Sequence, residues 1–238
     1  VMPVEAAELY RKALASFTSV YDQEGAEMDV AQLRSMISAN INLEQYEDAI
    51  ALGDRFLQTH GDEAQIWSIY ADALQRAERV DEAITALERV KELDPEYANL
   101  AMRQANWLLE SGRIDESIPL FNEAIERGEQ TADRVAYQVW ANGYQMGVDP
   151  KNWDYAVRVM GLARQFETSD EMGEQINFWL GFAMFNQAIG RQEAQTLETA
   201  EATLPRFQEA LRLISGAGGY AARQNIETTR QQLIGNVN

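Results

Sequence analysis

Small, apolar and acidic residues recur at fixed intervals along the middle of this chain. Three short segments, YEDAI, VDEAI and IDESI, place Ala49, Ala83 and Ser117 at a constant step of 34 residues. A fourth segment, WDYAV, places Ala156 a further 39 residues on. The excess falls in MGVDPKN, which we expect to be a loop because it contains Gly147 and a proline. The pattern therefore predicts an array of similar units.

Apolar residues recur in phase with these small residues, at the spacing of amphipathic helices. Each unit ends with a stop signal, HGDE, DPEY or RGEQ, and a new amphipathic run follows it. Alternating β-branched patterns and hairpin turns are missing from the sequence, so we expect two helices per unit and no strands. The in-phase positions, three residues before and seven residues after each small residue, are Tyr46, Val80, Ile114, Trp153, Phe56, Val90, Ala124 and Ala163.

The repeated unit resembles the tetratricopeptide repeat. The segment AQIWSIYADALQRAERVDEAITALERVKELDP, residues 64–95, is similar to that repeat almost throughout, and LAMRQANWLLESGRIDESIPLFNEAIERG is a second good match. The unit at residues 30–63 departs from the pattern, because Ile37 and Gly53 replace the expected small and aromatic residues. The signature positions of the two good matches hold Trp67, Tyr70, Ala71, Leu74, Ala83, Leu87, Pro95, Ala105, Leu108, Gly112, Phe121 and Ala124.

The resemblance implies an all-α solenoid of about five antiparallel helix pairs, with capping helices at both ends and a right-handed superhelical path. In this fold the small residue lets the second helix of a pair press closely on the first. Neighbouring units must stack, because each leaves an apolar face uncovered. We expect an N-terminal helix in residues 1–28, four repeats in residues 29–169 (30–63, 64–97, 98–131 and 132–169), a lengthened fifth pair in 170–215 and one capping helix in 216–238.

The lengthened fifth pair contains a proline in its second helix. That helix is expected to begin near Glu193, and Pro205 should kink it or restart it at Leu204. The following SGAGGY reads as a hinge-like break before the capping helix. Although GAGGYA formally fits a dinucleotide-binding fingerprint, that fingerprint needs a preceding strand and a helix is expected here.

The composition narrows the class of partner. The 238 residues carry a formal net charge of -18, which repels phosphate backbones and anionic headgroups. Nucleic acid is therefore not expected as a partner, and no apolar run is long enough for direct membrane insertion. The chain has no cysteine and one histidine, His60, which lies at a predicted helix end. We therefore expect no catalytic site, no metal site and no cofactor.

The family register assigns twelve side chains to the groove formed by the first helices of the repeats. The best-known subclass of the family binds a peptide carboxylate through a set of Lys, Asn and Arg side chains. Of that set only Arg103 is present here, because Asn99 and Ser38 occupy positions where Lys and Asn are expected. A carboxylate clamp of that kind is therefore not expected. The predicted groove residues are Arg34, Asp72, Arg76, Met102, Arg103, Asn106, Tyr137, Trp140, Tyr144, Phe178, Phe182 and Phe185.

The aromatic members of this set allow two interpretations. Their spacing, with Tyr137, Trp140 and Tyr144 on one helix and Phe178, Phe182 and Phe185 on another, fits a binding wall that stacks on a peptide or a polysaccharide. The same spacing also fits a buried core stripe. The sequence leaves both alternatives open.

Two functional hypotheses follow. The first is a non-enzymatic protein-binding scaffold that holds a segment of a partner protein or peptide in its groove. The second is a structural subunit that assembles with copies of itself into an oligomer or an extracellular filament, because open solenoid ends can propagate contacts without closing. Since the sequence starts at Val1 rather than at Met, we expect a periplasmic or extracellular location in preference to a cytoplasmic one.

Overall fold

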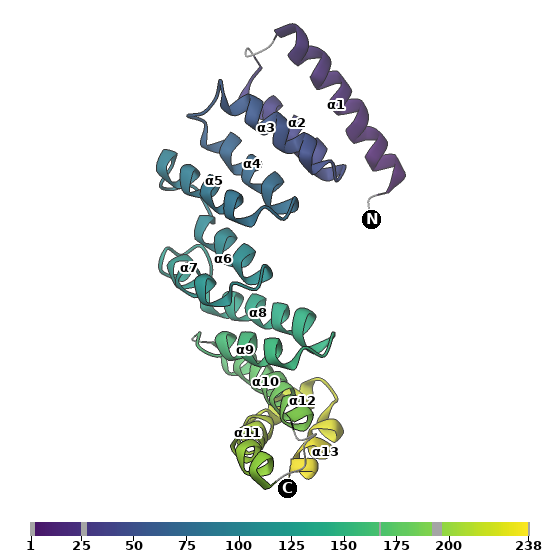
Figure 1. Cartoon of the computed structure of the whole chain (residues 1–238), viewed down its shortest axis with the longest axis vertical. Coiled ribbons are helices and arrows are strands. Elements are labelled where there is room, and N and C mark those ends of the chain that lie inside the picture. Colours follow the sequence, from purple (N-terminus) through teal and green to yellow (C-terminus); the bar gives the residue numbers. More distant parts are fainter. Residues whose placement is uncertain (1–2, 25–27, 167, 192–196, 238) are drawn as a thin grey trace. The chain divides into compact units, whose positions relative to one another are not determined.

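The computed structural model describes residues 3–24, 28–166, 168–191 and 197–237, and every regular element among them is a helix (Figure 1). The expected all-α fold of paired helices is therefore confirmed. The chain divides into two compact units, Val1–Ser111 and Gly112–Asn238, which we call unit 1 and unit 2. The expected start of a helix at Glu193 lies outside the described residues.

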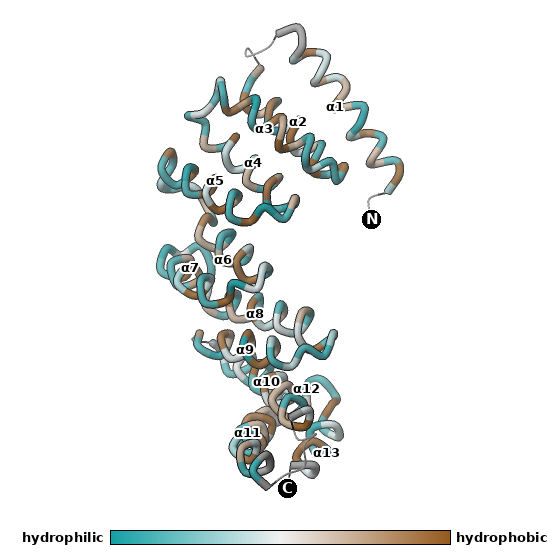
Figure 2. The backbone as a smooth tube through the Cα atoms, in the orientation of Figure 1, coloured by the Kyte–Doolittle hydropathy of each residue, from teal (hydrophilic) through white to brown (hydrophobic). Residues whose placement is uncertain are grey.

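Unit 1 consists of a long N-terminal helix followed by the helices of the first repeats. Its helices are α1 (Val4–Glu24), α2 (Val30–Asn42), α3 (Tyr46–Leu57), α4 (Ala64–Arg76), α5 (Val80–Leu93) and α6 (Leu100–Glu110). Consecutive helices pack on one another from α1 to α6, and α2 also packs on α4. Hydrophobic and hydrophilic residues alternate around these helices (Figure 2), which is the pattern of helices that bury one face.

Unit 2 begins with the second helix of the third repeat and ends with the C-terminal helices. Its helices are α7 (Ile114–Glu126), α8 (Ala132–Gly143), the π-helix η2 (Tyr144–Val148), α9 (Trp153–Ala163), α10 (Asp170–Arg191), α11 (Leu197–Gly216), α12 (Gly218–Arg223) and α13 (Glu227–Val237). The lengthened pair α10 and α11 forms the most extensive helix contact of this unit, and α13 packs on α11.

The recurrent small residues are all fully buried. Ala49, Ala83, Ser117 and Ala156 each have 0% of their surface exposed. The hydroxyl of Ser117 donates a hydrogen bond of 2.6 Å to the carbonyl of Ile114 in the preceding turn, so this polar side chain is satisfied inside the core. The small residues of the repeat are therefore core residues, as close packing of the helix pairs requires.

The turn between the two helices of each repeat also follows the repeat. One residue there has a left-handed backbone: Glu44, Glu78, Gly112 and Lys151 have φ values of 60°, 62°, 80° and 62°. They succeed one another at the same intervals as the small residues. Only one of the four is glycine, so the surrounding helices hold this conformation even where a side chain disfavours it.

The segment MGVDPKN, which was expected to be a loop, is partly helical. Residues 144–148 continue α8 as η2, and residues 149–151 form the turn. A π-helix accommodates extra residues without ending the hydrogen-bonded helix. Gly147 allows it, because a Cβ on that residue would lie 2.6 Å from the Cβ of Ala156. The inserted turn thus packs directly on the small residue of α9.

Two elements at the C-terminal end differ from what was expected. Of the two alternatives for Pro205, the helix restart at Leu204 is wrong, because α11 continues through Pro205. Because Pro205 and Glu201 are both exposed, water can satisfy the carbonyl that loses its helical partner. The capping region is two helices, because Asn225 adopts a left-handed φ of 57° and Ile226 N donates to Ala221 O at 2.9 Å, which ends α12.

Gly53 explains the departure of the first repeat from the family pattern. A Cβ on Gly53 would lie 2.3 Å from Cδ2 of Tyr70, so the tyrosine ring of the next repeat fills the space of the missing side chain. The Tyr70 hydroxyl donates a hydrogen bond of 2.7 Å to Asp54, which fixes the ring in place. The absent aromatic residue of one repeat is thereby replaced by the aromatic residue of the following one.

We predict that Gly53→Ala lowers the free energy of unfolding by about 1–3 kcal/mol, because the added methyl group must displace the Tyr70 ring. Urea unfolding followed by circular dichroism measures the change. The control is Gly161→Ala in α9, where a Cβ meets nothing within 4 Å. This control should leave stability unchanged or raise it by up to about 1 kcal/mol. A Gly53→Ala variant as stable as the original protein would contradict this account of the packing.

Candidate functional site

The first helices of the repeats in unit 1, α2, α4 and α6, present a shared polar surface that we call the first-helix face. Its centre is Arg103 on α6. The Arg103 guanidinium donates to Ser68 Oγ at 2.8 Å, to the Ser68 carbonyl at 3.2 Å and to Asp72 Oδ1 at 2.5 Å. It also lies 5.1 Å from the ring centre of Trp107. Arg103 and Asp72, both predicted groove residues, therefore bind each other and tie α6 to α4.

Arg34 makes the corresponding contact between α2 and α4, but with a neutral partner. Its Nη1 donates to Gln65 Oε1 at 2.8 Å. Its Nε is buried and has no hydrogen-bond acceptor among the described residues. Within the same part of the chain, no carboxylate forms an ion pair with Arg34. The charge of Arg34 is therefore less well compensated than that of Arg103.

A groove of about 420 Å³ lies beside Arg34, between α1, α2 and α4. We call it the α1 groove. Its walls include Tyr10 and Phe17 from α1 and Ile69 from α4, and the α2 side contributes serines and alanines. The sequence analysis assigned Arg34 and Ser38 to the groove-lining register but did not assign α1 to it. The signal that was available is the apolar spacing of Tyr10, Ala13 and Phe17, one face of a helix.

The other predicted groove residues of unit 1 differ in exposure. Arg76 on α4 is exposed and Asn106 on α6 is half-buried, so both offer surface to a ligand. Met102 is only 5% exposed. Met102 therefore contributes little accessible surface to the first-helix face.

The six aromatic candidates of unit 2 also divide by exposure. Tyr137 is 43% exposed, whereas Phe178 and Phe185 are 2% and 7% exposed and belong to a hydrophobic core cluster. Trp140, Tyr144 and Phe182 are half-buried and pack against a neighbouring cluster that includes Val148, Ala156 and Leu180. Most of this aromatic surface therefore supports the packing of α8, α9 and α10.

Trp179, which the sequence analysis did not single out, joins these aromatic side chains. Its ring lies 4.8 Å from Tyr144 and 5.6 Å from Phe182 between ring centres, both at steep interplanar angles. Its indole N–H donates to the Tyr220 hydroxyl at 2.9 Å, which links α10 to α12. Such edge-to-face contacts stabilise aromatic packing beyond the area buried. The strongly apolar sequence around Trp179 gave no means to distinguish it from its neighbours.

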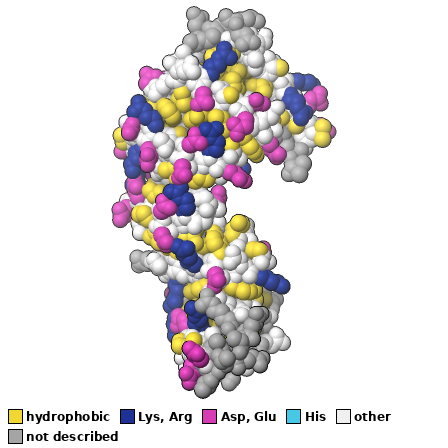
Figure 3. Space-filling view, viewed as in Figure 1, with side chains coloured by type: hydrophobic (Ala, Val, Ile, Leu, Met, Phe, Trp, Pro, Cys, Tyr) yellow, Lys and Arg dark blue, Asp and Glu magenta, His cyan; other side chains and the backbone are white. Residues whose placement is uncertain are grey.

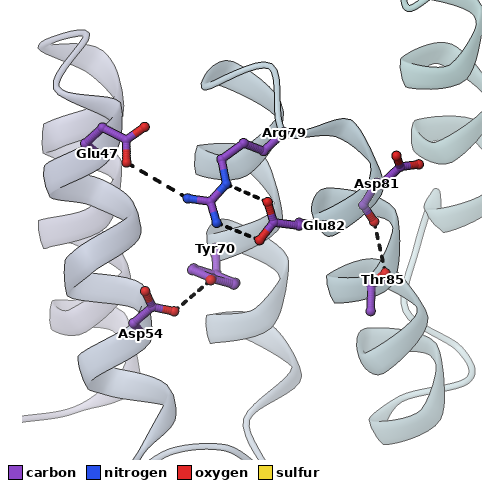
Figure 4. A network of polar contacts seen from close by, with 7 residues as sticks. All are labelled: Glu47, Asp54, Tyr70, Arg79, Asp81, Glu82 and Thr85. Carbon is purple, nitrogen blue, oxygen red and sulfur yellow. Dashed lines mark hydrogen bonds and ion pairs between the residues drawn. The ribbon is translucent and has the colours of Figure 1, made fainter.

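A polar network connects the first two repeats of unit 1 (Figure 4). Arg79 donates to both carboxylate oxygens of Glu82, at 2.7 and 2.6 Å, and lies 3.9 Å from Glu47 on α3. The hydrogen bond from Arg79 lowers the pKa of Glu82. In the same network, burial and then the hydrogen bond to Asp54 raise the pKa of the Tyr70 hydroxyl well above its usual value. Tyr70 therefore remains a neutral hydrogen-bond donor.

The Arg79–Glu82 pair recurs one repeat later as Arg113 and Glu116, again with two hydrogen bonds, of 2.8 and 2.6 Å. Each pair lies at the start of the second helix of a repeat, where the carboxylate also faces the positive end of the helix dipole. The recurrence at the same step identifies this pair as part of the repeat framework. We therefore do not include it in the candidate site.

Acidic side chains are interspersed with basic and hydrophobic ones over unit 1 (Figure 3). No group of three or more His, Cys, Asp or Glu residues in the described ranges is arranged to hold a metal ion. The ring of His60 is hydrogen-bonded to the hydroxyl of neighbouring Thr59 at 2.8 Å.

None of the described helices combines the length and apolar character needed to cross a bilayer.

Comparison with protein-family models gives one description, the tetratricopeptide repeat, which matches residues 36–98 and 71–133 in two overlapping alignments. These alignments cover the two repeats in which the sequence pattern is strongest. No curated protein matches the chain.

Solved structures with similar folds include MamA, at 18% identity and a TM-score of 0.50, where the match covers 69% of this chain and 95% of that one. A second is MamA 41-end from Desulfovibrio magneticus RS-1, at 15% identity and a TM-score of 0.44, covering 76% and 92%. A third is YrrB, described as a TPR protein with an unusual peptide-binding site, at 15% identity and a TM-score of 0.46, covering 83% and 91%. At 18% identity, the match to MamA with a TM-score of 0.50 indicates a shared fold alone.

The structure predicts that Arg103 and Asp72 are energetically coupled. A double-mutant cycle with Arg103→Gln and Asp72→Asn should give a coupling free energy of about 1 kcal/mol in urea unfolding, because the pair is partly shielded from water. The control is Arg89 with Glu92 on α5, a 2.6 Å ion pair whose side chains are 44% and 65% exposed. That pair should couple by about 0.3–0.5 kcal/mol. Equal coupling in the two cycles would show that the Arg103 contact is an ordinary surface pair.

Proposed function

Because residues 36–133 match the tetratricopeptide repeat, we propose that the chain is a non-enzymatic scaffold that holds a segment of a partner protein against the first-helix face. The observation that carries this proposal is the pre-ordered polar surface of α2, α4 and α6. Arg103, Ser68 and Asp72 are held by contacts between helices, and Arg76 and Asn106 beside them stay accessible. A surface already ordered before binding loses less conformational freedom when a partner docks.

The composition of unit 1 supports a protein partner with basic or mixed charge. Residues 1–111 contain 21 acidic and 9 basic side chains. This balance disfavours anionic polymers and favours encounter with a basic surface. The proposed partner is therefore a protein segment, as in the primary sequence-based hypothesis.

Self-assembly is the second candidate function, and a specific observation favours it. Large apolar side chains are exposed in both units: Val4 and Leu9 are 81% and 68% exposed, and Met146 and Leu204 are 53% and 54% exposed. Exposed apolar side chains of this kind can form contacts between copies of a chain.

We predict that a photoreactive amino acid at Arg76 or Asn106 will cross-link a discrete partner protein in the native source, because both positions lie on the first-helix face. The matched controls are Glu88 and Arg89, exposed positions on α5, the second helix of the same repeat as Arg76. They should give no such product. Mass spectrometry of the cross-linked species measures the outcome.

Two results would contradict the scaffold proposal. The first is cross-linking to the same proteins from Glu88 and Arg89 as from the first-helix face. The second is cross-linking only to copies of this chain, together with a mass that rises with concentration in light scattering. The second result would establish the self-assembly function in its place.

A further inference from the structure

The α1 groove differs from the rest of the first-helix face in having an exposed apolar wall. Tyr10 on α1 is 36% exposed although it lines the groove, and Leu9 beside it is 68% exposed. In unit 1, α1 packs on α2. An amphipathic helix that leaves such side chains in water gains stability when another element covers them.

The groove also contains a positive charge that no described carboxylate neutralises. Arg34 is half-buried, donates to the neutral Gln65, and forms no ion pair within the described residues. By contrast, Arg103 on the same face is paired with Asp72. A partly desolvated guanidinium without a counter-charge is costly, and a carboxylate from a ligand would compensate it. Arg34 is thus a cation without a carboxylate partner among the described residues of a strongly acidic unit.

The dimensions of the groove fit a short helical segment. From Tyr10 to Phe17 the α1 wall extends about 10 Å, which is about two turns of a helix. The floor on α2 consists of small residues, Ala31, Ser35, Ser38 and Ala39, over which another helix can pack closely. Two turns present apolar side chains at positions i, i+4 and i+7, the spacing with which helices fill grooves.

An extended segment fits this groove less well, because its backbone groups would lack partners. The Ser35 hydroxyl already donates to the Ala31 carbonyl at 2.7 Å, and Ser38 Oγ lies 3.4 Å from the amide nitrogen of Asn42. Apart from the Arg34 guanidinium and the Tyr10 hydroxyl, the side chains that line the rest of the groove are apolar. A helix satisfies its own backbone hydrogen bonds, whereas an extended chain would bury unpaired N–H and C=O groups.

We propose that the α1 groove binds an amphipathic helical segment of a partner protein, with aliphatic side chains against Tyr10, Phe17 and Ile69 and a carboxylate on Arg34. This inference rests on the proposed scaffold function and assigns a helical segment of the partner to the α1 groove. It separates the acid-recognising α1 groove from the part of the first-helix face around Arg103, which is already paired with Asp72.

The test is a display selection of random peptides of about 15 residues, roughly four helical turns, on the full chain. Enriched peptides are then made as labelled synthetic probes. They should carry an acidic residue and aliphatic residues on one helical face, and circular dichroism should show that they gain helix on binding. Arg34→Gln should weaken their binding about tenfold or more, because a charge-assisted hydrogen bond is lost.

Two further variants complete the experiment. Ser38→Trp fills the groove without removing a core side chain and should abolish binding, while Arg89→Gln removes an exposed cation from α5 and should leave binding unchanged. Circular dichroism of each variant verifies folding. Arg34→Gln removes the positive charge of the groove, and Ser38→Trp fills its volume. If one variant misfolds, the other still tests whether the peptides bind in the α1 groove.

Several outcomes would overturn the inference. These are enriched peptides that bind in an extended form, that carry no acidic residue, or that bind Arg34→Gln and Ser38→Trp as tightly as the original protein. Concentration-dependent dimers that Ser38→Trp abolishes would show that a second copy occupies the groove instead. Failure of this test with cross-linking at Arg76 or Asn106 intact would refute the α1 groove assignment while leaving the scaffold function standing.

Discussion

The close contact of small side chains between paired helices is the constraint on which the rest of this structure depends. Ala49, Ala83, Ser117 and Ala156 are fully buried, and the first three follow one another at a constant step of 34 residues. A larger side chain at such a contact would force the helices apart. The packing of α2 on α4 places Arg34 within reach of Gln65, and α6 presents Arg103 to α4 in the same way. The candidate site is therefore a consequence of the repeat.

Arg34 and Arg103 show how two positions of the first-helix face can serve different purposes. Arg103 is neutralised by Asp72 and held by Ser68, so it orders the surface on which a partner would lie. Arg34 has only a neutral partner and faces a groove with apolar walls. The sequence placed both in the groove, but their different surroundings follow from residues on other helices.

The repeat, the helix pairs and the burial of the small residues could be predicted from the sequence, because they depend on periodic local patterns. Features that depend on contacts between distant residues could not. The Tyr70 ring can fill the space beside Gly53 only because two helices approach each other in three dimensions. Likewise, η2 arises because Gly147 can approach Ala156, and the α1 groove exists because α1 lies beside α2. The aromatic spacing in unit 2 was ambiguous for the same reason, since burial is decided by the neighbours of a helix.

The most direct test of the central claim is the stability of Ala83→Leu, measured by urea unfolding beside the control Ala51→Leu at an exposed position of α3. If close helix contact at the small residue governs the fold, Ala83→Leu should lose about 1–3 kcal/mol or more, because its site is fully buried. The Ala51→Leu variant should change by no more than about 0.5 kcal/mol. An Ala83→Leu protein as stable as the control would contradict the account, since the repeat would then not depend on a small side chain.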